Sequence, residues 1–134
     1  MGLIEELAAH LDTESTRFTL GTNFALNFMP DEPNTCASMV EYGGAAPDYS
    51  FAGDLPVNEN ARVAVTCRST SSATARANIG AAWVALQRVT NETLSSHSWL
   101  RCAAVQSPFL LGRDAQSRVE YRANFDCMRR TTST

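Results

Sequence analysis

The sequence predicts an α+β domain in which two helices pack on one face of a mainly antiparallel, twisted sheet of about five strands. Three observations predict this class. Two segments carry apolar residues at spacings of three and four, several shorter segments alternate apolar and polar residues, and turn-forming residues separate them. At 134 residues the chain is near the usual size of one domain, so a single domain over 1–134 is expected.

The first expected element is a helix from about Gly2 to Asp12, because its apolar residues recur at helical spacing on one stripe. The residues of this stripe are Leu3, Ile4, Leu7, Ala8 and Leu11. The stripe is expected to face the core, which leaves Glu5, Glu6 and His10 facing away from it.

Two strands are expected after this helix. Over residues 22–29, Phe24, Leu26 and Phe28 alternate as residues of a strand that faces a core should. A second strand, over 36–42, has a weaker alternation because polar residues interrupt its apolar set. Its register is therefore less well defined than that of the first strand.

The stretch from Gly43 to Asn60 is expected to be the longest loop of the chain, because it is rich in Gly, Pro and Asp. Loops of this length in compact domains are commonly functional. The aromatic residues Tyr49 and Phe51 in this stretch, which are expected to be exposed, therefore favour a functional loop.

The middle of the chain contains the clearest strand and the clearest helix. Residues 61–68 alternate, with Val63, Val65 and Cys67 on the apolar face. A run of hydroxyl residues then offers an N-cap, and an apolar stripe follows over 73–89, which predicts a helix. The residues of this stripe are Ile79, Ala82, Trp83, Leu86 and Val89.

Three segments link this helix to the last strand. Residues 91–98 are expected to be a polar link, and residues 99–105 a strand that is buried over much of its length. Residues 106–118 are expected to form a Pro-containing turn with a charged corner at Arg113 and Asp114.

The last expected strand alternates almost without a break over 119–127. Its apolar face consists of Val119, Tyr121, Ala123, Phe125 and Cys127. The opposite face carries a charged row that consists of Arg118, Glu120, Arg122, Asn124 and Asp126. This row is expected to be either solvated or in contact with another subunit, and residues 129–134 to form a frayed polar tail.

Composition narrows the possible functions. The hydrophobic fraction of 44% and the charged fraction of 19% argue against wholesale disorder. A net charge of -3, with no basic cluster beyond Arg129 and Arg130, argues against tight nucleic-acid binding. No apolar run reaches the roughly 20 residues of a membrane-spanning helix, and the N-terminal segment lacks the basic start of a secretory signal. A cytoplasmic location is therefore expected.

The cysteines and histidines show no ligand or catalytic spacing. The four cysteines are Cys36, Cys67, Cys102 and Cys127. They are expected to be buried, reduced thiols, with a disulfide between adjacent strands as the alternative. His10 and His97 are expected at the surface, and no P-loop, GxGxxG or GxSxG motif is present. The sequence therefore predicts no cofactor, no metal and no catalytic residue.

A series of short motifs in the second half of the chain resembles one known family. Val63 to Arg68 runs straight into the helix over 73–89, and later come Gln106-Ser107-Pro108, Leu111-Gly112-Arg113-Asp114, Arg118 and a strand that ends in Asn124-Phe125. Their order and spacing resemble the tail terminator family of long-tailed bacteriophages, often labelled minor capsid proteins. The resemblance covers roughly Asn60 to Cys127.

The resemblance implies a structural virion protein without catalytic residues or cofactors. Such a protein forms a ring, hexameric in that family, on the finished tail tube, stops the addition of tube subunits and offers its other face to head-completion proteins. The implied partners are further copies of the chain, the major tail tube protein and a head-completion protein, with DNA only passing through the lumen and no membrane. The implied location is the tail-neck region of the virion, after assembly in the host cytoplasm.

Two other functions remain possible from the sequence. One is another neck or connector ring between head and tail, which would bind on the portal side. The other is a small α+β enzyme or ligand-binding domain, which needs a concave pocket with convergent polar groups. For a ring protein, the candidate interface residues are Tyr49, Phe51, Arg113, Asp114, Arg118, Glu120, Arg122 and Asp126.

Overall fold

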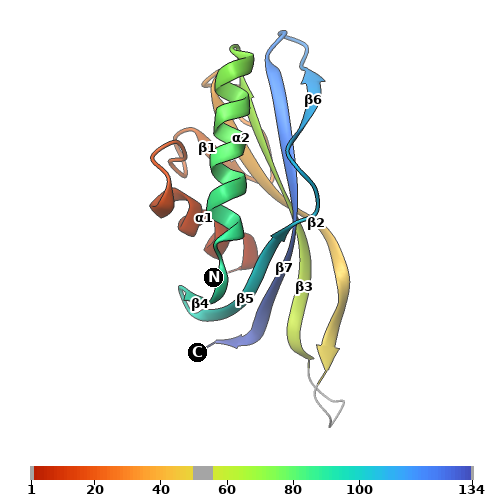
Figure 1. The fold of residues 1–134 in the computed structure, drawn as a ribbon. Helices are drawn as coiled ribbons and strands as arrows, with labels where there is room; N and C mark the ends of the chain where they lie inside the picture. Colours follow the sequence, from red (N-terminus) through yellow and green to blue (C-terminus); the bar gives the residue numbers. More distant parts are fainter. Residues whose placement is uncertain (1, 50–55, 134) are drawn as a thin grey trace.

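The computed structural model describes residues 2–49 and 56–133, which form two helices and a seven-stranded sheet. The strand order is β1-β2-β3-β7-β5-β4, and β6 also pairs with β7. The helices lie on one side of the sheet (Figure 1). The elements are α1 (Leu3–Glu14), β1 (Phe24–Leu26), β2 (Cys36–Tyr49), β3 (Pro56–Ser69), α2 (Ser72–Gln87), β4 (Thr90–Leu94), β5 (His97–Ala104), β6 (Phe109–Arg113) and β7 (Val119–Ser133).

The predicted α+β class is confirmed, and the sheet has more strands than the predicted five. Every strand pair is antiparallel except β1 with β2. The additional strands are β4, in the expected polar link, and β6, in the expected Pro-containing turn. Both are five-residue strands with one neighbour each, and their local sequences lack the alternation of a half-buried strand. These two strands form because they pair with β5 and β7. The order of apolar and polar residues within each segment does not reveal this pairing.

Both predicted helices are confirmed. In α1 the predicted apolar stripe is buried. In α2 the Ser71 hydroxyl accepts a hydrogen bond from the Thr74 amide at 3.3 Å, which makes it the N-cap. The stripe of α2 packs on β3, β5 and β7, with Ile79, Ala82 and Leu86 fully buried. α1 packs beside α2 and against β2, so one core lies between the two helices and one face of the sheet.

The four cysteines are free and buried, as predicted. Cys102 on β5 and Cys127 on β7 are directly paired across the sheet, and their Sγ atoms lie 3.3 Å apart. Burial raises the pKa of the Cys67 thiol well above its usual range. These side chains therefore act as small apolar residues of the core.

The prediction of a loop from Gly43 to Asn60 is wrong for the residues that the structure describes. β2 continues to Tyr49 and pairs with β3 as far as Pro56, so the two strands form a long hairpin arm that projects beyond the helices (Figure 1). Gly44 does not end the strand, because it lies where a Cβ would collide with the backbone carbonyl of Asn60. Glycine here permits close strand pairing. Phe51 lies outside the described residues.

Two further expectations are wrong. Residues 129–133 are not a frayed tail, because β7 runs to Ser133 and pairs there with β3 and β5. Phe28 does not face the core: its side chain is 63% exposed, since β1 ends at Leu26. β7 is extended by pairing with strands that are distant in sequence, whereas β1 stops before Asn27, whose positive φ of 71° departs from strand geometry.

Candidate assembly surfaces

The face of the sheet that the helices leave uncovered carries much of the predicted charged row. We call this the open face, and its central side chains come from β2, β3 and β7. Arg122 lies with its guanidinium carbon 5.5 Å from the centre of the Tyr42 ring, and its Nε donates to Asn124 Oδ1 at 3.1 Å. Arg62 Nε lies 3.1 Å from Asp126 Oδ1, with both side chains about half exposed. Such exposed contacts are weak, so these groups can exchange partners.

Arg118 differs from the rest of the row because it is buried. Only 5% of the residue is exposed, whereas the prediction placed it on a solvated or interface-facing edge. Its guanidinium donates to Asp114 Oδ2 at 2.7 Å, to the Asp31 carbonyl at 2.6 Å and to Asn34 Oδ1 at 3.3 Å. Arg118 therefore ties the β6–β7 corner to the turn over residues 30–34.

Asp114, the other member of this corner, also makes its contacts within the subunit. Its carboxylate accepts hydrogen bonds from the backbone amides of Gln116 and Arg118, each at 2.9 Å. Desolvation acts to raise the pKa of Asp114, but the hydrogen bonds from Arg118 and Gln116 outweigh it and lower the pKa. Arg113 donates to the Ser117 carbonyl at 2.8 Å and is exposed at the end of β6.

Arg68 holds the same turn and was missed by reasoning from the sequence. Its guanidinium donates to the carbonyls of Asp31 at 3.1 Å, Pro33 at 2.9 Å and Asn34 at 3.3 Å. The residue is only 3% exposed. Alternation placed Arg68 on the polar face of its strand, but no local pattern indicated that the turn over 30–34 folds across that face.

Glu6 was expected to face away from the core, and this is wrong, because it is 1% exposed and lies at the centre of a buried polar cluster. Trp99 Nε1 donates to Glu6 Oε1 at 3.0 Å, and Arg129 Nη1 donates to the same oxygen at 3.2 Å. His97 Nδ1 lies 2.8 Å from Glu6 Oε2, and the Ser96 amide donates to that oxygen at 3.3 Å. His97 is itself buried in β5, so its expected surface position is also wrong.

The electrostatics of this cluster favour an ionised Glu6. Burial acts to raise the pKa of the Glu6 carboxyl, but hydrogen bonds from His97, Trp99, Ser96 and Arg129 lower it to about 2. Because a carboxylate only accepts, His97 donates through Nδ1. The cluster joins α1 to β5 and β7, so its role in this geometry is to fix the first helix on the sheet.

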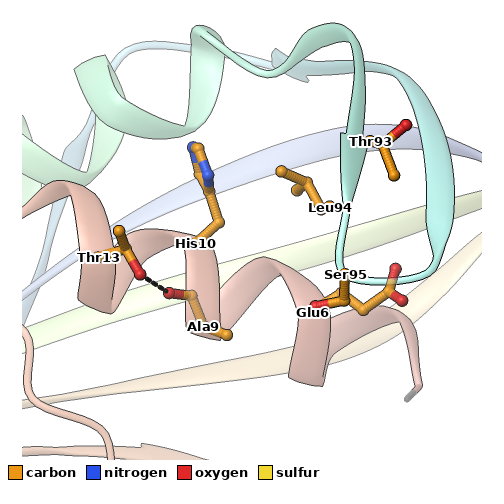
Figure 2. Close-up of a pocket in the computed structure, with 7 residues that line it drawn as sticks. All are labelled: Glu6, Ala9, His10, Thr13, Thr93, Leu94 and Ser95. Atoms are coloured by element: carbon orange, nitrogen blue, oxygen red, sulfur yellow. Dashed lines mark hydrogen bonds between the residues drawn. The ribbon is translucent and has the colours of Figure 1, made fainter.

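A small cavity lies between α1 and the β4–β5 turn (Figure 2). Its volume is about 200 Å³, and its lining residues are Glu6, Ala9, His10, Thr13, Thr93, Leu94 and Ser95. The only carboxylate in this lining, that of Glu6, is already occupied by the buried donors. His10 Nε2 is buried and makes no hydrogen bond within the part of the chain that the structure describes. The cavity therefore lacks the convergent polar pair that acid–base chemistry needs.

Two apolar surfaces lie at the edges of the sheet. Beside β1, a hollow of about 400 Å³ has Leu20, Leu26 and Phe28 among its lining residues, with Glu32 also in its lining. At β6, the side chains of Leu110 and Leu111 are 56% and 47% exposed. We call these surfaces the β1 hollow and the β6 ridge. Sequence reasoning did not identify either as a contact surface.

Two kinds of site are absent from residues 2–49 and 56–133. No group of three or more His, Cys, Asp or Glu side chains in these ranges is placed to hold a metal ion. No helix in them is long and apolar enough to cross a membrane.

Comparison with known proteins identifies the family. A model of the bacteriophage tail terminator protein family matches residues 9–129. Among solved structures, a chain from the virion of a native gene transfer agent particle has a similar fold, with a TM-score of 0.62 and 15% sequence identity over 96% of this chain and 98% of that chain. The comparison with curated protein sequences found no match. The chain therefore belongs to the bacteriophage tail terminator protein family, whose members are structural proteins of the phage tail and not enzymes.

Proposed function

We propose that this protein forms a ring of six subunits at the head-proximal end of the phage tail tube. There it stops tube polymerisation and provides the docking surface for the head-completion complex. The observation that carries this proposal is the family match over residues 9–129, which includes the second half of α1, all of α2 and most of the sheet.

The physical requirement for such a protein is asymmetry. A subunit that ends a polymer of rings has to bind the last ring on one face and offer no equivalent surface on the other. A cyclic ring meets this requirement, because its lateral contacts are heterologous and its two faces differ. The fold suits it, since the hairpin arm of β2 and β3 projects at one end of the sheet and the β6–β7 corner lies at the other (Figure 1).

The proposed partners are further copies of this chain, the major tail tube protein and a head-completion protein. DNA passes through the lumen without being held, which is consistent with the net charge of -3. Assembly takes place in the host cytoplasm, and the finished ring lies in the tail-neck region of the virion.

The candidate interface residues are assigned different parts in this proposal. The open face offers Glu120, Arg122 and Asp126 to a partner, and Tyr49 belongs to the hairpin arm. Arg118 is not proposed to touch a partner. It supports the surface indirectly, because its guanidinium donors tie the β6–β7 corner to the turn over residues 30–34.

The test is to mix the purified protein with tail tube subunits of its own phage and to measure tube lengths by negative-stain electron microscopy. We expect shorter tubes with a ring at one end, because the bound ring blocks further addition. A preparation unfolded by heat serves as the control and should leave tube length unchanged. Tubes of unaltered length and without a terminal ring would contradict the proposal, and a ring found only on the portal side would indicate another neck protein.

A further inference from the structure

The β1 hollow and the β6 ridge are exposed apolar surfaces that the fold itself does not explain. Phe28 in the hollow is 63% exposed, and Leu110 and Leu111 on the ridge are each about half exposed. An exposed apolar edge and an apolar hollow on the same chain are the two surfaces that a heterologous contact between copies would need. Such a contact needs the two surfaces to lie on opposite sides of the subunit.

The strand register places the β1 hollow and the β6 ridge on opposite sides of the subunit. In one continuous row across the sheet, Phe24 of β1 pairs with Ala37, Ala37 with Cys67, Cys67 with Tyr121, and Tyr121 with Leu110 of β6. The row crosses four strand spacings of about 4.8 Å, so its two ends are about 19 Å apart. The hollow and the ridge therefore lie at the same height along the strands, at opposite edges of this half of the sheet.

A lateral contact in a ring requires that its two surfaces lie at the same position along the ring axis. If the ring axis runs along the strands, each subunit is related to the next by a rotation that leaves its height unchanged. The edge of one subunit then meets the opposite edge of its neighbour at the same level. Leu110 would face the level of Phe24, which is one of the residues that line the neighbour's hollow.

Charge adds a second match just beyond this row, toward the level at which β2 begins. Arg113 follows the ridge at the end of β6, where it pairs with Val119, beyond the level of Leu110. Glu32 lies in the turn that precedes β2, and it lines the hollow. Both side chains are exposed, and neither forms a salt bridge within the residues that the structure describes.

We propose that the β6 ridge of one subunit inserts into the β1 hollow of the next copy of this chain, with Arg113 meeting Glu32 across the contact. The proposal rests on the ring proposed above and specifies its lateral interface. The buried Arg68 and Arg118 support this contact indirectly, because they hold the turn that carries Glu32.

The test is disulfide cross-linking with two single-cysteine additions, Phe28→Cys and Leu111→Cys. The two variants are mixed under conditions in which rings assemble, oxidised, and analysed by non-reducing electrophoresis. Cross-linked dimers are expected in the mixture and not in either variant alone, because the contact joins unlike edges. The two edges of one chain are too far apart for an internal bridge.

A chain that carries both substitutions sharpens the test. It is expected to give a ladder of cross-linked species that ends at the number of subunits in the closed ring. The matched control pairs Phe28→Cys with Glu92→Cys, which is exposed on β4 in the other half of the sheet, and should give no ladder. A ladder only from the control pair, or cross-linking of Leu111→Cys with itself, would overturn the proposal.

Charge reversal provides an independent measurement. Arg113→Glu and Glu32→Arg are each expected to reduce the fraction of tubes with a terminal ring by about tenfold, and the double variant is expected to restore it. Absence of rescue combined with absence of cross-linking overturns the contact.

These experiments separate the two proposals. Wild-type rings on tube ends without cross-linking through positions 28 and 111 leave the terminator function standing and refute this interface. Failure of the wild-type protein to form rings or stop tubes refutes both.

Discussion

The buried cluster around Glu6 and the open face around Arg122 are built from the same kinds of residue but differ in their surroundings. Glu6 and Arg129 are nearly inaccessible, and several protein groups satisfy the Glu6 carboxylate. Arg62 and Asp126, on the open face, form an ion pair that is about half exposed. Removing one partner of a buried pair leaves an uncompensated charge, whereas water replaces a partner at the surface. The first cluster is therefore suited to hold the fold, whereas the groups of the second remain exposed on the surface that we propose as a partner contact.

The largest effect is expected from Glu6→Ala. His97 and Trp99 lose their buried acceptor and Arg129 loses one of its carboxylate partners while keeping Glu59, so we expect the free energy of unfolding to fall by about 3–5 kcal/mol. Urea denaturation followed by Trp fluorescence measures this change. The matched control is Glu5→Ala, an exposed neighbour in the same helix, with an expected change within about 0.5 kcal/mol. Equal effects of the two substitutions would contradict the structural role of the cluster.

Acid is expected to weaken the same cluster without any mutation. The pKa of Glu6 is lowered from 4.5 to about 2 by folding, so its contribution to stability is complete above about pH 4.5. As the pH falls toward 2 the contribution is lost, up to about 3 kcal/mol. The measurement is the difference in unfolding free energy between the wild type and Glu6→Gln from pH 6 to pH 2. A difference that does not shrink on acidification would disprove the assignment.

An intermediate effect is expected from Arg118→Ala. The turn over residues 30–34 loses the charged donor that ties it to Asp114, so stability should fall by about 1.5–3 kcal/mol. Arg62→Ala, which removes an exposed ion pair, is the control and should cost less than about 1 kcal/mol. Thermal unfolding of the two variants measures the contrast. A smaller loss for Arg118→Ala than for Arg62→Ala would show that the turn does not depend on this residue.

The smallest effect on stability is expected from Arg122→Glu. Its contacts with Tyr42 and Asn124 lie on the open face, so the unfolding free energy should change by less than about 1 kcal/mol. If the open face binds a partner, the same variant should nevertheless lose ring formation or docking on tubes. Both quantities are measured on one preparation, by denaturation and by electron microscopy. Normal assembly of this variant would remove Arg122 from the interface.

The sequence predicted the elements that have a strong local period. The stripe of α1, the capped helix α2 and the alternation of Val63, Val65 and Cys67 are confirmed. Each of these segments buries one continuous face, so the spacing of its apolar residues indicates which face points toward the core. The short strands β4 and β6 lack such a spacing, because they form only by pairing with a neighbouring strand at the edge of the sheet.

The candidate site was less predictable than the fold. Arg118 and Glu120 are adjacent members of one alternating row, yet Arg118 is buried by a turn that precedes it by more than 80 residues. The β1 hollow and the β6 ridge become related only through the register that joins Phe24 to Leu110 across the sheet. The spacing of residues within any one segment does not show that these two surfaces are related.

The α+β class, the two helices, the burial of the four cysteines and the resemblance to tail terminators could all be predicted before the structure was known. Each follows from residue spacing or motif order within a segment. Three features became visible only in the folded chain: Glu6 is buried, β2 and β3 extend into an arm, and two apolar surfaces lie at the same level on opposite edges of the sheet. The hydrogen bonds and burial of these residues exist only once the strands have paired, and the partners of Glu6 and of the two apolar surfaces are distant in the chain.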